Sequence, residues 1–168
     1  MLGINLLFAG FALTLNGISY IKPVDDKAKG ISNAIVALII AINAVFQISQ
    51  AYNHIAFGFG AAMWLFAVSY FLVAIHILFK STNWGAVGLY GLFAGLVSIA
   101  FAIDIIVAGG PWEMAYMWSM WSVLWLQSFF AISLNLNAIN KVTPHVLILN
   151  GIASTFVPGI LVLLGIIL

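Results

Sequence analysis

The chain has 168 residues, of which 65% are hydrophobic and only 5% are charged, and its formal net charge is +1. Soluble globular domains carry about a quarter charged residues, so this composition indicates an integral membrane protein. At about 20 apolar residues per crossing, the length accommodates six helices with short loops. The apolar runs are longer than the ~10-residue alternating strands of a β-barrel, and the low charge leaves no basic patch for nucleic acid.

Six apolar stretches predict an all-α membrane protein in which residues 1–168 form one transmembrane channel domain. The first stretch lacks the positively charged region of a signal peptide, so we interpret it as a span and not as a cleaved leader. The predicted spans cover residues 2–21, 31–52, 57–79, 84–108, 114–137 and 144–167.

The residues between the spans contain helix start and stop signals. Asp25 or Asp26 is suited to cap the second helix. The run Gly109, Gly110 and Pro111 is expected to end the fourth. Thr143 and Pro144 are typical of the N-cap and first residue of a helix, which places the start of the sixth span there.

All basic side chains are lysines, and they occur in alternate connections. Lys22, Lys27 and Lys29 lie in the first connection, Lys80 in the third and Lys141 in the fifth. The positive-inside rule therefore places these connections in the cytoplasm and both termini outside. The six spans then group as three helical hairpins, each with its turn in the cytoplasm.

The fifth span carries an aromatic stripe. One helix sector contains Met114, Trp118, Trp121, Trp125 and Phe129. Membrane aromatics usually gather in belts at the two interfaces, whereas this stripe runs down the helix. Either the rings pack between helices, or they line a narrow path for a flat, neutral, polar solute. Indoles can stack on a planar amide and donate one hydrogen bond each, but they do not replace the hydration of an ion.

The first span has two faces of interest. Glycine recurs every seven residues at Gly3, Gly10 and Gly17, which predicts a seam of close helix approach. The adjacent face either packs or forms a smooth wall opposite the tryptophans, and it consists of Leu2, Leu6, Ala9, Leu13 and Asn16.

Uncharged amides also occur within the spans. Asn43, Gln47 and Gln50 share a face of the second span, where hydrogen bonds between helices are the simpler explanation. Asn150 lies in the sixth span, where Pro158 interrupts the backbone ladder at Ser154 and can leave a carbonyl free inside the bundle.

Titratable residues suggest two further functions. Asp104 is the only acid within a predicted span, near its outer end, and His54 lies in an outer connection. Asp104 would serve a proton-coupled transporter. His76 and His145 both lie near the cytoplasmic side and could approach one another, as in a haem- or quinone-associated subunit of a respiratory complex. Four serines within the spans have no obvious base at helix spacing, namely Ser49, Ser69, Ser98 and Ser128, and there is no cysteine, so we expect neither catalysis nor a metal site.

Three stretches together resemble the bacterial urea/amide channel family of the AmiS/UreI type. They are MLGINLLFAGFALTLNGI at 1–18, WSMWSVLWL at 118–126 and KVTPHVLILNG at 141–151, and the resemblance runs nearly end to end. It implies a passive channel for urea and short aliphatic amides in the bacterial cytoplasmic (inner) membrane, surrounded by lipid and without a cofactor. It also implies a ring of six protomers, each with its own pore, supplying a cytoplasmic urease or amidase.

The resemblance also assigns site residues. Trp121 and Trp125 correspond to the constriction tryptophans of the family, faced by Tyr70 and Phe66. The remaining residues expected to line the pore are Leu2, Leu6, Leu13, Asn16, Trp118 and Asn150, with Asp104 and His54 at the outer mouth.

Two departures from the family pattern stand out. Gastric members have long outer loops rich in histidine and acids, whereas here these connections shrink to about 53–56 and 109–113, with His54 as their only histidine. One exposed imidazole, which titrates near pH ~6.5 when unperturbed, does not readily supply a cooperative gate, so we expect a pH-independent channel. Gastric members also have a glutamate at the inner vestibule where this chain has Asn150.

Overall fold

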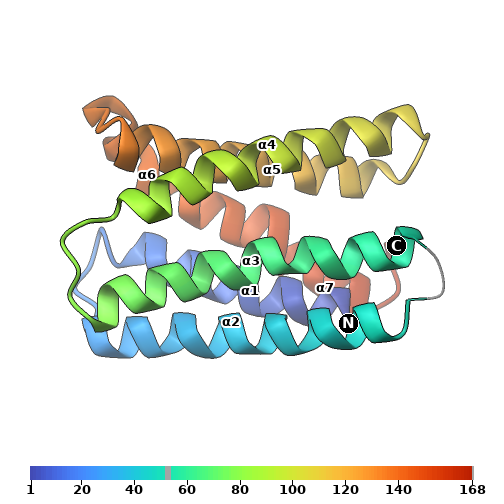
Figure 1. Cartoon of the computed structure of the whole chain (residues 1–168), viewed down its shortest axis with the longest axis horizontal. Coiled ribbons are helices and arrows are strands. Elements are labelled where there is room, and N and C mark those ends of the chain that lie inside the picture. The colour runs from blue at the N-terminus through green and yellow to red at the C-terminus, as the bar shows by residue number, and fades with distance from the viewer. Residues whose placement is uncertain (52–53, 168) are drawn as a thin grey trace.

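In the computed structural model, residues 1–51 and 54–167 are described, apart from the side chains of 54–56 and 58. This part of the chain forms six helical rods that run in roughly parallel and antiparallel directions (Figure 1). They are α1 (Leu2–Ile18), α2 (Asp26–Ser49), α3 (His54–Leu78), α4 (Gly85–Val107), α5 (Trp112–Ser128) with the π-helix η1 (Phe129–Ser133), and α6 (Asn137–Leu149) with the π-helix η2 (Asn150–Phe156) and α7 (Val157–Leu163).

The lengths and composition of the rods suit a membrane. Four helices of the described chain are long and apolar enough to cross one, namely 26–49, 59–78, 85–107 and 137–163, and α1 is a shorter apolar helix. Large aliphatic side chains are exposed on the outward faces of the bundle, such as Ile42 on α2 and Leu89 on α4. Such faces are stable against lipid or another protein, not against water.

The connections that carry the lysines all lie at one end of the bundle. Both termini lie at the end where α4 connects to α5, and the connections that follow α1, α3 and α5 lie at the opposite end (Figure 1). The predicted segregation of the lysines is therefore confirmed. We refer to the end with the lysines as the inner end and the other as the outer end; that the inner end faces the cytoplasm stays a prediction.

Two helix boundary signals act as expected. Asp25 Oδ1 accepts a hydrogen bond from the backbone N–H of Ala28 at 2.7 Å, so α2 begins at Asp26, ahead of the predicted span. At the end of α4, Gly109 adopts a left-handed φ of 66°. The N–H of Gly110 then bonds to the carbonyl of Ile105 at 2.8 Å, which closes the helix.

The predicted start of the sixth span is wrong. Pro144 lies inside α6, which begins at Asn137. Proline removes the bond that its N–H would have made to the carbonyl of Asn140. Asn140 is exposed near the inner end, where water can hydrate that carbonyl, so the helix continues. Thr143 is not the cap; its hydroxyl donates back to the carbonyl of Ile139 at 3.0 Å.

The glycine seam of α1 is confirmed. An added Cβ at Gly10 would lie 2.7 Å from the carbonyl oxygen of Gly151, and one at Gly3 would lie 2.9 Å from that of Gly159. Small residues let membrane helices approach until their backbones touch. The seam thus holds α1 against the last helix and turns the neighbouring leucine face into the bundle.

Three helix packings dominate the bundle. α2 packs along α3, α4 packs along α5, and α1 packs along the last helix from α6 to α7. The buried core lies between these pairs and includes Leu6, Ile40, Phe66 and Trp121. The predicted hairpins would pair the first span with the second, the third with the fourth and the fifth with the sixth. The extensive contacts join different pairs of helices, so this grouping stays a prediction.

Candidate solute pathway

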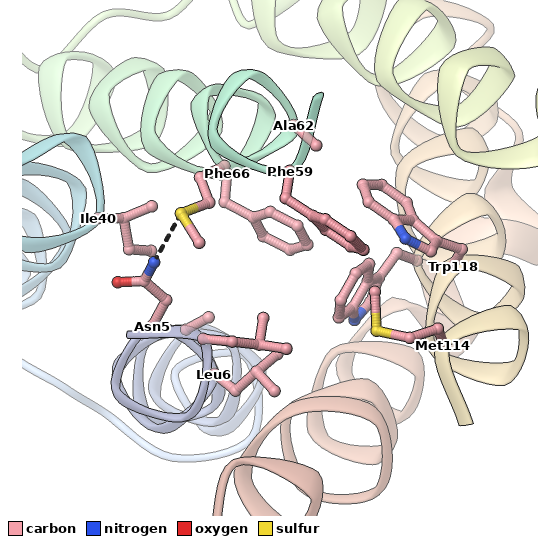
Figure 2. A pocket seen from close by; sticks show the side chains of 12 residues that line it. Asn5, Leu6, Ile40, Phe59, Ala62, Phe66, Met114 and Trp118 are labelled. Carbon is pink, nitrogen blue, oxygen red and sulfur yellow. Dashed lines mark hydrogen bonds between the residues drawn. The ribbon is translucent and has the colours of Figure 1, made fainter. Parts of the chain in front are cut away.

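A small cavity opens toward the outer end of the bundle. It has a volume of about 40 Å³, room for more than a single water molecule. Figure 2 shows Asn5 and Leu6 of α1 on one side, Phe59 and Phe66 of α3 on the second and residues of α5 on the third. Its wall is made of Leu2, Asn5, Leu6, Ala9, Ile40, Phe59, Ala62, Met63, Phe66, Met114, Trp118 and Trp121.

A larger cavity lies toward the inner end and has a volume of about 410 Å³. Its wall is more polar than that of the outer cavity. The same helices contribute to it from positions further along, with Asn16 from α1, Val73 from α3 and Gln127 from α5, while Thr143 adds a hydroxyl from α6.

The two cavities are separated by a layer of packed side chains. On α1 the outer cavity ends at Ala9 and the inner begins at Asn16, which at 1.5 Å per residue is about 10 Å along the helix. Leu13, Tyr70 and Trp125 occupy the interval on α1, α3 and α5, and all three are buried. These residues therefore form a packed layer between the two cavities, which we call the constriction.

Aromatic contacts hold this constriction together. The ring of Phe66 lies 4.7 Å from Trp121, edge to face, and 4.7 Å from Trp125. The Tyr70 hydroxyl donates to the carbonyl of Ala9 at 3.0 Å, which ties α3 to α1. The structure thus brings Phe66, Trp121 and Trp125 into contact across α3 and α5, and all four predicted constriction residues, Tyr70 included, belong to the same buried core.

Two of the tryptophans retain free donors. Trp118 stacks on Phe101 at 4.7 Å and meets Trp121 edge to face at 4.9 Å. The indole N–H groups of Trp118 and Trp121 are buried and have no hydrogen-bond partner among the described residues. A buried donor without a partner costs about 1–3 kcal/mol. Both tryptophans belong to the wall of the outer cavity.

Trp125 differs from its neighbours. Its Nε1 donates to Ser69 Oγ at 2.9 Å, and Ser69 in turn donates to the carbonyl of Leu65 at 2.7 Å. The donor of Trp125 is thus occupied, and the residue acts as a wall. The sequence suggested that every indole of the stripe could donate to a solute. Among the tryptophans of the stripe, only Trp118 and Trp121 keep an unpaired N–H in the described chain.

The predicted polar residues of the pore are both paired. Asn16 lines the inner cavity and exchanges two hydrogen bonds of 2.9 Å with Asn33. Asn150 is 1% exposed, lines neither cavity and donates to the carbonyl of Val146 at 3.1 Å. The carbonyl of Asn150, the first residue of η2, accepts the hydroxyls of Ser154 and Thr155 at 2.8 and 3.0 Å. That Pro158 leaves a carbonyl free for a solute stays a prediction.

The other predicted wall residues fall into three groups. Leu2 and Leu6 line the outer cavity, and Leu13 lies in the constriction. Asp104 is exposed on α4 and is not among the residues lining the outer cavity. His54 is the first residue of α3, but its side chain lies outside the described part of the chain.

Several polar residues near the path were not predicted from the sequence. Asn5 lies in the wall of the outer cavity, donates to the Met63 sulfur at 3.1 Å and accepts from Asn43 at 2.6 Å (Figure 2 shows the first bond). The interhelical role expected of Asn43 is thereby confirmed. Asn5 lies beside the leucine face of α1, so a broader choice of the helix sector in the sequence would have included it. Gln127 lies outside the stripe of α5, and no pattern in the sequence pointed to it.

The histidines give no support to a haem site. The two ring nitrogens of His76 each lie 2.8 Å from a backbone carbonyl oxygen, of Leu72 and of Asn83, so both are already engaged. His145 is exposed on α6. Within residues 1–51 and 54–167 no group of three histidines, cysteines or acids is placed to hold a metal ion.

Comparison with known proteins points to one family. The family model described as "AmiS/UreI family transporter" matches residues 1–166. The "Acid-activated urea channel" of Helicobacter pylori is 29% identical, and the match covers 95% of both chains. The "Putative amidate substrates transporter protein" of Mycolicibacterium smegmatis is 24% identical over 97% of this chain and 76% of that protein.

Solved structures agree with this comparison. The crystal structure of the Helicobacter pylori urea channel superposes with a TM-score of 0.86 and 28% identity, covering all of both chains. The cryoEM structure of the same channel in a closed state gives a TM-score of 0.85 and 27% identity, covering 98% of both.

Proposed function

Because the chain belongs to the AmiS/UreI family of transporters, we propose that it is a passive channel through which urea and short aliphatic amides cross a bacterial inner membrane. The path runs from the outer cavity through the layer of Leu13, Tyr70 and Trp125 to the inner cavity. The names of its relatives, a urea channel and an amidate transporter, support this choice of solute.

The unpaired indole donors of Trp118 and Trp121 are the observation that carries the proposal. Urea and acetamide each present a carbonyl oxygen that accepts such a bond and a flat face that packs against rings. The rest of the outer wall is almost entirely apolar, so a solute must shed water to enter. The two indoles compensate for part of this dehydration.

The same wall disfavours ions. Among the residues lining the outer cavity none is charged, and the constriction offers only rings and a leucine. A desolvated ion loses many kcal/mol of hydration that such groups do not return. Neutral solutes that need only a few hydrogen bonds are therefore favoured.

We further propose that conduction does not depend on external pH. Few residues separate α2 from α3 and α4 from α5 at the outer end. Asp104, the acid predicted at the outer mouth, does not line the outer cavity. The residues between these helices include no histidine, and His54 is the first residue of α3, so the outer end offers little for a titrating gate.

The assembly we propose is a ring of six protomers in lipid, each with its own path, as the family resemblance implies. The outward apolar faces of α2 and α4 are suited to contact lipid or a neighbouring copy. Urea or amide entering the cell would supply a cytoplasmic urease or amidase.

Stopped-flow light scattering on proteoliposomes tests this function. We expect urea and acetamide to enter vesicles with the protein much faster than empty vesicles, at both pH 5 and pH 7.5. Entry at pH 5 only would keep the channel and refute pH independence. No accelerated entry at either pH would refute the channel itself.

A further inference from the structure

Gln127 carries a buried acceptor that nothing in the described chain satisfies. The residue lies two positions after Trp125, where the constriction ends, and it lines the inner cavity. Its side chain is only 7% exposed. Its Oε1 is buried and has no hydrogen-bond partner among the described residues.

Neighbouring groups decide which way the amide points. Thr143 has a single hydroxyl proton, which it donates to the carbonyl of Ile139 at 3.0 Å. In this arrangement Thr143 Oγ1 accepts from Gln127, and the group 2.5 Å from it is the Nε2 donor. A flipped amide would require the Thr143 hydroxyl to leave the Ile139 carbonyl and donate to Gln127 instead. The unpaired position is thus an oxygen, held by Thr143.

We propose that Gln127 is a specificity-determining residue at the inner exit of the constriction, where its Oε1 accepts a hydrogen bond from the N–H of a urea or primary amide. This inference rests on the proposed channel function, and it adds that hydrogen-bond donors and acceptors occur in a fixed order along the path. Trp118 and Trp121 offer donors on the outer side, which match the carbonyl oxygen of the solute. Gln127 offers an acceptor on the inner side, which matches the NH₂ group.

This order suits a solute that crosses the apolar layer. A molecule between the two cavities loses most of its water, because Leu13, Tyr70 and Trp125 fill the interval. Its N–H groups then have few partners until they reach Gln127. A hydrogen bond at that point lowers the barrier for amides and ureas and offers nothing to small neutral solutes without a donor.

Gln127→Met is the first test, because methionine keeps the length of the side chain and removes the acceptor. We expect urea and acetamide flux in proteoliposomes to fall about five-fold, the value of one ordinary hydrogen bond. The substitution also loses the hydrogen bond to Thr143, but it removes an unpaired buried oxygen at the same time, so the melting temperature should stay within a few degrees of wild type. A purely structural role of Gln127 would predict that flux and stability fall together, whereas the proposed role predicts lower flux at nearly unchanged stability.

Ser133→Ala is the matched control. Ser133 Oγ is another buried oxygen without a partner in the described chain, and Ser133 does not line the inner cavity. Its removal should leave flux unchanged. Should Gln127→Met fail to fold, Gln127→Asn withdraws the amide by one methylene and should lower flux at least two-fold.

The outcomes separate the two proposals. A wild-type protein that does not accelerate urea entry refutes the channel. A conducting wild type whose flux is unaffected by Gln127→Met, or by Gln127→Asn where that variant is used, refutes the role of Gln127 and leaves the channel intact. An equal loss of flux in Ser133→Ala also overturns the inference, because any perturbation near η1 would then be sufficient.

Discussion

The indole N–H of Trp125 donates to Ser69 Oγ at 2.9 Å, whereas that of Trp121, one turn away on the same helix face, has no partner in the described chain. The bond from α5 to α3 fixes the Trp125 ring in the constriction. The donor of Trp125 is therefore occupied, whereas that of Trp121 is unpaired in the described chain.

Ser69→Ala should make Trp125 less firmly held. The substitution leaves a buried indole donor unpaired, at a cost of about 1–3 kcal/mol, so thermal unfolding in detergent should shift to lower temperature. We also expect weaker discrimination between acetamide and larger amides in vesicle uptake. Ser98→Ala, which removes a buried hydroxyl bonded only to Ala94 of its own helix, serves as control. Equal selectivity in the two variants would argue against a role of Ser69 in the constriction.

Trp121→Phe should separate the ring from its donor. The phenyl ring keeps much of the contact with Phe66 but offers no N–H, and urea flux should fall about five-fold if the solute uses that bond. Trp64→Phe on the exposed face of α3 is the control and should not change flux. Wild-type flux in Trp121→Phe would show that the indole acts by shape alone.

Tyr70→Phe should loosen the contact between α3 and α1. The hydroxyl donates to the Ala9 carbonyl at 3.0 Å, and its net contribution to stability is about 0.5–1.5 kcal/mol. We expect a modest drop in melting temperature and an altered urea flux, because Ala9 and Tyr70 lie at the junction of the outer cavity and the constriction. Tyr116→Phe, at an exposed tyrosine of α5 that lines neither cavity, is the control and should change neither property.

Gly10→Ala should strongly destabilise the bundle. The new Cβ would lie 2.7 Å from the carbonyl oxygen of Gly151 and 2.8 Å from the backbone nitrogen of Phe156, and neither backbone atom can move away freely. Overpacking of this kind costs about 1–3 kcal/mol. At Gly85 the only contact is the end of the Asn83 side chain at 3.0 Å, so Gly85→Ala should be tolerated. Thermal unfolding in detergent compares the two, and equal stability would contradict the seam.

The sequence alone determined much of the architecture. The long apolar runs predicted the helices, the alternate lysine connections predicted which ends lie together, and the spacing of Gly3, Gly10 and Gly17 predicted the seam of α1. Each of these features depends on a single helix or on the order of helices along the chain. It can therefore be predicted from the sequence without knowing which helices pack against each other. The boundary at Pro144 was missed because solvent near Asn140 relieves the lost backbone bond.

Only the tertiary structure decided what individual polar atoms do. Periodicity brought Trp118, Trp121 and Trp125 to one face but did not distinguish their N–H groups, because a partner depends on the height and rotation of α3 against α5. For the same reason Asn16 and Asn150, suggested as solute ligands, are paired within the protein. Gln127 emerged because Thr143, from a different helix, orients its amide. Hydrogen bonds act over about 3 Å, and only the assembled bundle sets distances between helices on that scale.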